Sequence, residues 1–286
     1  MTWQPQLGII TDELTQDLHE ALAFLSSYRL PWCELREVWG RNIVGLAQAE
    51  LDRAKAALAL KGIRVSSIAS PIFKWNLPGG GTGLSLSGRD FQTTYTEEDA
   101  DTLLDRVFKV ADFFETRNVR IFSYWRLAEP EKAFSMISDR LGKAAQLAGS
   151  NGIILLLENE HACNIGTGAE LGRLLREVNS PNLRGIWDPG NAFVLGEIPF
   201  PDGYGQVKGL FPHMHIKDVR KNEQSGQLEW MPVGGGSIDY KGQFEALRRD
   251  GYGGTMSLET HYRRADGNNI ESTRESLEGL LKMLAE

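Results

Sequence analysis

The segment Ile153-Ile154-Leu155-Leu156-Leu157-Glu158 ends a run of five aliphatic residues with a carboxylate. Three later segments also end an apolar run with a side chain that can bind a metal ion: Leu183-Arg184-Gly185-Ile186-Trp187-Asp188, Phe211-Pro212-His213-Met214-His215 and Thr255-Met256-Ser257-Leu258-Glu259. Helix-like sequence separates the four segments, which predicts successive parallel strands whose C-terminal ends face the same way. Two glutamates, one aspartate and one histidine at these ends would form a cage for a divalent cation.

The rest of the chain continues this alternation of strand and helix. Strand-like segments at 7–11, 32–38, 64–72 and 119–124 precede the four quoted segments, and the sixth crossover, at 199–207, looks irregular. Eight strands alternating with helices over roughly 250 residues are typical of an α/β (β/α)8 TIM barrel. We therefore expect one barrel domain over residues 1–286, with glycine-rich residues 79–83 forming either a mobile flap over its mouth or a plain turn.

Composition narrows the class of partner. The net charge of −7 argues against nucleic acid as a partner, because phosphate binding normally requires a basic surface. The only two cysteines, Cys33 and Cys163, lie far apart, which suits a reducing compartment and no disulfide framework. The sequence has no apolar stretch long enough for a membrane span and no secretory h-region near its N-terminus. A cytoplasmic protein with neither nucleic acid nor membrane as partner is the expectation.

The four strand ends contain the candidate chemistry, since a barrel enzyme takes its catalytic groups from the C-terminal ends of its strands. A carboxylate after an aliphatic run is costly to bury unless a cation or a hydrogen-bond donor compensates it, and for any single one that partner could be an arginine or a loop. Paired carboxylates alone would also suit acid–base work, so the aspartate and histidine point to a metal. Mixed nitrogen and oxygen ligands favour one Mn²⁺, Co²⁺, Mg²⁺ or Zn²⁺ ion over a thiolate-type site.

The string His213-Met214-His215-Ile216-Lys217-Asp218 resembles the His-x-His-x-Lys-Asp motif of the xylose isomerase-like barrels. That superfamily includes ketohexose 3-epimerases, hydroxypyruvate isomerases, inosose dehydratases and DNA-repair endonucleases. Further matches fall in the family's order over essentially the whole chain: Cys33-Glu34-Leu35-Arg36, Leu157-Glu158-Asn159 and Trp187-Asp188-Pro189-Gly190-Asn191.

The resemblance implies that Glu158, Asp188, His215 and Glu259 are the metal ligands. In the epimerase branch the two glutamates also face each other across the substrate; one removes a carbon-bound proton and the other returns it. The chain is accordingly expected to be a metal-dependent isomerase or epimerase of a small sugar or polyol-derived ketone, with Glu158 and Glu259 as its catalytic residues. Two alternatives remain open: an inosose-type dehydratase with the same metal site, and a sugar-binding barrel without turnover. DNA cleavage is disfavoured, because it needs about three metals and more ligands than this chain can easily supply.

Two departures from the epimerase pattern concern substrate contacts. The epimerases commonly have a histidine where this chain has Asn191, and an arginine where it has Lys221, so the identity of the sugar does not carry over. The expected substrate-binding residues are Glu160, Asn191, His213, Lys217, Lys221 and Trp125. Relatives are often dimers or tetramers, and a homodimer or tetramer is the corresponding expectation.

Overall fold

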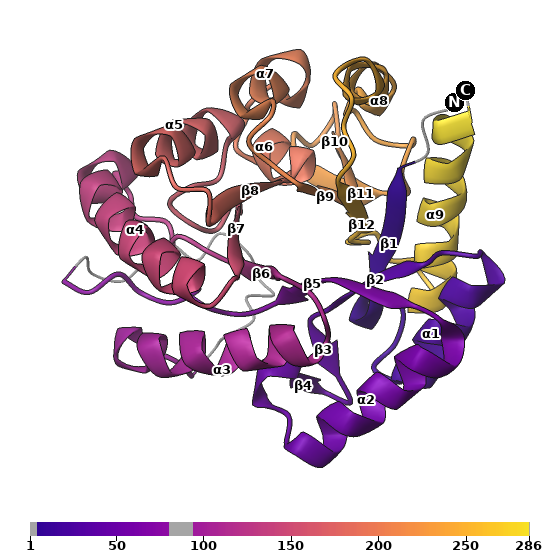
Figure 1. The fold of residues 1–286 in the computed structure, drawn as a ribbon. Coiled ribbons are helices and arrows are strands. Elements are labelled where there is room, and N and C mark those ends of the chain that lie inside the picture. Colours follow the sequence, from indigo (N-terminus) through magenta and orange to yellow (C-terminus); the bar gives the residue numbers. More distant parts are fainter. Residues whose placement is uncertain (1–4, 80–93, 286) are drawn as a thin grey trace.

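Eight parallel strands close into a barrel in the computed structural model, which describes residues 5–79 and 94–285 (Figure 1). The barrel strands are β1 (Gln6–Ile10), β2 (Trp32–Leu35), β5 (Arg64–Ala69), β6 (Asn118–Ile121), β7 (Ile154–Glu158), β8 (Leu183–Trp187), β9 (His213–Ile216) and β12 (Thr255–Leu258). Strand β1 pairs with β2 on one side and with β12 on the other, which closes the barrel. The predicted (β/α)8 architecture is confirmed.

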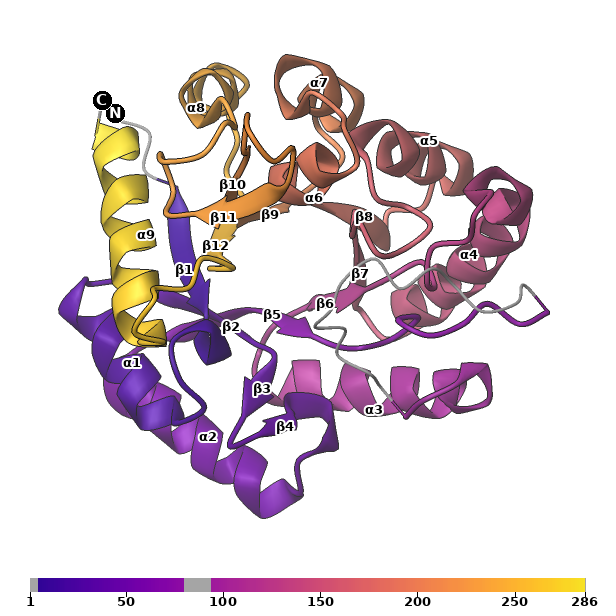
Figure 2. The ribbon, with the colours of Figure 1, turned by 180° about the vertical axis from the view of Figure 1, so that it is seen from behind.

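Helices form a ring outside the strands in both views (Figures 1 and 2). They are α1 (Leu18–Ser27), α2 (Gln48–Lys61), α3 (Ala100–Phe113), α4 (Phe134–Ser150), α5 (Gly168–Val178), α6 (Pro189–Val194), α7 (Tyr204–Val207), α8 (Tyr240–Arg249) and α9 (Asn269–Ala285). The sixth crossover is irregular as expected, since only the short α6, a helical turn at Pro199–Gly203 and α7 lie between β8 and β9. Within 5–79 and 94–285, no helix is both long and apolar enough to span a membrane.

Strand β7 illustrates how the sequence positions functional groups at the mouth. Leu155, Leu156 and Leu157 are all fully buried, because a parallel barrel strand is covered by helices outside and by the barrel core inside. Side chains alternate along a strand, so Glu158 at its last position points to the same side as Leu156. The run of leucines therefore ends with a carboxylate directed into the barrel mouth.

Several of the predicted strands are too long; the one expected at 119–124, for example, stops at Ile121. The strand expected at 32–38 stops at Leu35, and β3 (Glu37–Val38) forms a separate antiparallel hairpin with β4 (Arg41–Asn42). Both loop residues, Trp39 and Gly40, have positive φ angles, the geometry of a two-residue hairpin turn that reverses the chain. The strand expected at 64–72 stops at Ala69, shortly before Pro71, whose ring nitrogen cannot donate a strand hydrogen bond.

A second hairpin gave no strand signal in the sequence. Strands β10 (Asp218–Lys221) and β11 (Leu228–Met231) pair antiparallel beside β9 and β12 in both views (Figure 2). The hairpin brings the ring of Trp230 to within 4.6 Å of the His261 ring, centroid to centroid, just beyond the end of β12. Of the glycine-rich residues 79–83, only Gly79 is among the described residues, so the expected flap lies outside them.

Candidate active site

The four predicted metal ligands come together at the C-terminal ends of their strands. All four are buried, and one ligand atom from each lies within 4.8 Å of the other three. The imidazole Nδ1 of His215 is 3.2 Å from Glu158 Oε1, 3.6 Å from Glu259 Oε2 and 3.9 Å from Asp188 Oδ2. We refer to Glu158, Asp188, His215 and Glu259 as the ligand cluster.

Local structure at the strand ends directs each side chain into the cluster. Glu158 is the last residue of β7 and His215 lies within β9, while Glu259 follows β12 directly. Asp188 follows β8 and caps α6, where its Oδ1 accepts a hydrogen bond of 2.9 Å from the Asn191 amide. Because the cap occupies Oδ1, the other carboxylate oxygen of Asp188 remains for the cluster.

Positively charged side chains surround the three carboxylates of the cluster. The ammonium group of Lys217, itself fully buried, is 2.8 Å from Asp188 Oδ2 and 2.7 Å from Glu259 Oε2. Arg36 donates to Glu259 Oε1 at 2.9 Å, and Arg120 Nη1 is 3.4 Å from Glu158 Oε2. Carboxylates this close repel one another, so these cations offset part of the unfavourable charge.

The same contacts shift the pKa values of the charged groups. Burial alone would lower the pKa of Lys217, but Asp188 and Glu259 hold that pKa well above its usual range. Burial alone would raise the pKa of Glu259, but Lys217 and His261 hold that pKa well below its usual range. Both groups are therefore charged at neutral pH, as a buried ion pair.

The cluster fits a divalent cation. Glu158 Oε2 is buried and accepts no hydrogen bond from the residues that the structure describes. A buried carboxylate oxygen in this state is costly, and a cation would satisfy it. Three carboxylates and one imidazole nitrogen form a donor set that suits Mn²⁺, Co²⁺, Mg²⁺ or Zn²⁺.

Three predicted substrate-binding residues lie beside the cluster: Lys217, whose ammonium group contacts Asp188 and Glu259, and Asn191 and Glu160; their substrate contacts stay predictions. Asn191 donates through Nδ2 to Glu158 Oε1 at 3.3 Å, and its Oδ1 is 2.9 Å from His161 Nδ1. Glu160 contacts the same imidazole nitrogen at 3.0 Å and the Lys74 ammonium group at 3.5 Å. These contacts link the end of β7 to the start of α6. Because Asn191 and Glu160 already have partners, a molecule bound at the cluster would contact them in addition to those partners.

The other predicted substrate contacts occupy different positions. Trp125 is half-buried in the loop after β6, with the Lys74 ammonium group 5.6 Å from its ring centroid. Lys221 is exposed at the far end of β10. His213 is fully buried, and its two ring nitrogens already contact Thr255 Oγ1 at 2.5 Å and Glu34 Oε2 at 3.0 Å. The substrate contact of each of these three residues stays a prediction. For His213 the geometry favours a different position, in which it holds Glu34 and does not face a substrate.

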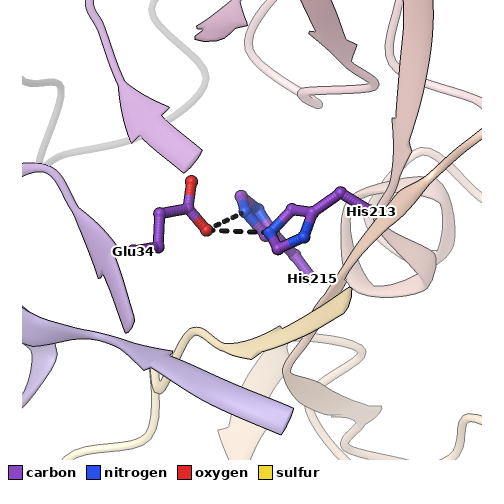
Figure 3. Close-up of side chains that lie close together, drawn as sticks. All are labelled: Glu34, His213 and His215. Carbon is purple, nitrogen blue, oxygen red and sulfur yellow. Dashed lines mark hydrogen bonds and ion pairs between the residues drawn. The ribbon is translucent and has the colours of Figure 1, made fainter. Parts of the chain in front are cut away.

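Sequence reasoning gave no role to Glu34 and Arg36, although both lie in a matched family motif, and it missed Asp12 and Glu13 after β1. Arg36 binds Asp12 and Glu13 as well as Glu259, and Glu34 contacts both His213 and His215 (Figure 3). Spacing was a usable signal for Glu34 and Arg36, because residues two positions apart in a strand have side chains on the same face of the sheet. No local signal marks Asp12 or Glu13; the pairing of β1 with β12 brings Glu13 close to Glu259, and Arg36 contacts Asp12.

Residues 28–283 match the family described as xylose isomerase-like TIM barrel, so the chain belongs to this family. The match covers all strands that supply the ligand cluster. It also confirms the family resemblance on which the predicted ligand set was based.

The chain is similar to a dehydratase, to an epimerase and to a protein solved with a zinc atom. Inosose dehydratase of Geobacillus thermodenitrificans (strain NG80-2) is 26% identical over 154 residues, which are 49% of this chain and 51% of the relative, so the chain matches about half the length of that protein. The crystal structure of 3-keto-D-glucoside 4-epimerase YcjR from E. coli has a TM-score of 0.72 at 19% identity, over 98% of this chain and all of that one. The IOLI protein, solved with a bound zinc atom, has a TM-score of 0.72 at 15% identity, over 98% of both chains.

Proposed function

We propose that this chain is a divalent-cation-dependent isomerase or epimerase of a small polyhydroxy ketone. The observation that carries the proposal is the buried ligand cluster, in which two glutamates from the ends of β7 and β12, separated by β8 and β9 in the barrel, approach one imidazole nitrogen. A divalent cation held there would polarise a carbonyl group and make the neighbouring C–H more acidic.

The residues around the cluster suggest different tasks for the two glutamates. Asn191 fixes one oxygen of Glu158, while the second oxygen has no hydrogen-bond donor in the described parts of the chain. We assign Glu158 as the base that takes the carbon-bound proton, since a base needs a free lone pair within reach of that proton.

Glu259 differs from Glu158 because each of its oxygens accepts a hydrogen bond from a cation, whereas Arg120 lies 3.4 Å from Glu158 Oε2 without a hydrogen bond. Arg36 donates to Oε1 and Lys217 donates to Oε2, at 2.9 and 2.7 Å. These contacts hold the carboxylate still and compensate its charge. We assign Glu259 to the opposite side of the substrate, where, once protonated from solvent, it gives a proton to the same carbon, while the proton taken by Glu158 leaves to solvent.

A dehydratase is the second candidate, favoured by the similarity to inosose dehydratases. It would use the same cluster and the same first step, removal of a proton next to a carbonyl. The two reactions differ in the second step: an epimerase returns a proton to the same carbon, whereas a dehydratase expels the neighbouring hydroxyl group as water.

Solvent isotope exchange tests this proposal and separates the two candidates. The chain, loaded with Mn²⁺ or Co²⁺, is incubated in D₂O with ketohexoses, 3-keto-glucosides and inososes, and the sugars are analysed by NMR and mass spectrometry. We expect a product of unchanged composition with deuterium at the carbon next to the carbonyl for an epimerase, or a product with one water fewer for a dehydratase. A sugar that binds the loaded protein but gains no deuterium and loses no water would contradict both and favour a binding barrel.

A further inference from the structure

Glu34 lies beneath the ligand cluster, on the opposite side of the His215 ring. Its side chain is fully buried, and its Oε2 is 3.0 Å from Nε2 of His215 and 3.0 Å from Nε2 of His213 (Figure 3). The other nitrogen of His215, Nδ1, faces the carboxylates of the cluster. One nitrogen of the His215 ring therefore faces Glu34, and the other faces the cluster.

An irregularity in the barrel coincides with this side chain. In the pairing of β2 with β5, Cys33 lies opposite Val65 but Glu34 lies opposite Ser67, so Ser66 is an extra residue. The Ser66 hydroxyl donates to the Cys33 carbonyl at 3.0 Å, which closes the bulge. Bulges are rare between parallel strands, and they change the direction of a neighbouring side chain.

The position of Glu34 is determined by more than one contact. His213 is held through Nδ1 by the Thr255 hydroxyl, so its Nε2 is directed at the same Glu34 oxygen that His215 contacts. Thr255 and His213 are register partners on β12 and β9, as are Ser257 and His215. Two fixed N–H donors thus hold one carboxylate oxygen in place under the cluster.

We propose that Glu34 is a positioning residue for cation binding. By accepting the Nε2 proton of His215, Glu34 fixes the tautomer whose Nδ1 lone pair faces Glu158, Asp188 and Glu259, and prevents rotation of the ring. A carboxylate behind a metal-binding histidine typically raises metal affinity about 10–100-fold. The inference rests on the proposed function only in assuming that the cluster binds a cation.

The test measures the dissociation constant of Co²⁺ and of Zn²⁺ by competition with a chromophoric chelator. The proteins are the wild type, Glu34→Ala, Glu34→Gln, and a control, Glu37→Gln, whose carboxylate contacts Gln16 instead of a histidine. We expect affinity to fall about 10–100-fold in Glu34→Ala and less in Glu34→Gln, whose amide oxygen can still accept a hydrogen bond, and to stay unchanged in the control. Thermal unfolding verifies that each variant is folded.

An NMR readout separates positioning from a general loss of structure. In ¹⁵N-histidine-labelled, Zn²⁺-loaded protein, His215 should show a slowly exchanging proton on Nε2. The signal is assigned by its absence in His215→Ala. In Glu34→Ala the same proton should exchange rapidly with solvent. Wild-type affinity in a folded Glu34→Ala would overturn the inference while leaving the proposed function intact. Two bound cations in the wild type, one of them lost in Glu34→Gln, would also overturn the inference, because Glu34 would then be a metal ligand. A wild type that binds neither cation would instead overturn the proposed function.

Discussion

Replacement of Glu158 by glutamine is expected to reduce the rate of deuterium exchange next to the substrate carbonyl by about 10²–10⁴-fold. Glutamine keeps the shape and one ligating oxygen, but it removes the carboxylate whose Oε2 has no donor among the described residues. The rate is measured in D₂O at a cation concentration shown to saturate the variant, so that the loss reports the base and not the metal.

A matched control accompanies this measurement. Glu170→Gln removes another partly buried carboxylate, which pairs with Arg126 at the start of α5, outside the ligand cluster. That variant should keep its exchange rate within a few-fold. A Glu158→Gln variant that binds the cation and exchanges as fast as the control would show that Glu158 is not the base.

Replacement of Lys217 by methionine is expected to lower the free energy of unfolding of the metal-free protein by about 3–5 kcal/mol. The side chain is buried with its ammonium group between Asp188 and Glu259, and removing it leaves two buried carboxylates without their shared cation. Adding Mn²⁺ should restore more stability to the variant than it adds to the wild type, because a bound cation replaces part of the lost charge. Urea unfolding of the wild type and of the variant, each with and without Mn²⁺, measures the four free energies of unfolding.

The control for this variant is Lys208→Met. Lys208 pairs with Asp250 at 2.9 Å, but its side chain is 54% exposed, and such surface pairs contribute about 0–1 kcal/mol. If Lys217→Met lost no more stability than Lys208→Met, then Lys217 would not be the counter-charge of the cluster.

The barrel could be predicted from the sequence because each of its strands is buried on both faces. The clearest of them, β7, is an unbroken apolar run, and the charged residue that ends it lies at the mouth. The ligand cluster was predictable for the same reason, because its four members follow or end separate runs.

The parts that were missed depend on contacts between distant segments. Glu34 is 181 residues from His215, and its function is visible only when β2 and β9 are placed across the barrel from each other. The β10–β11 hairpin mixes polar and apolar residues, and most of them are exposed or half-buried, so its strands lack the apolar pattern that identifies a barrel strand. In the β3–β4 hairpin, the turn places Trp39 at a positive φ, which its residue type does not indicate.

The central claim is that Glu158, Asp188, His215 and Glu259 together hold one divalent cation. The most direct test is the metal content of the purified chain after loading with Mn²⁺ or Co²⁺ and gel filtration, beside Asp188→Asn, His215→Ala and the surface control His19→Ala. We expect about one equivalent per chain in the wild type and in His19→Ala, and little or none in the other two. A wild type without bound metal, or a full equivalent retained in both cluster variants, would contradict the claim.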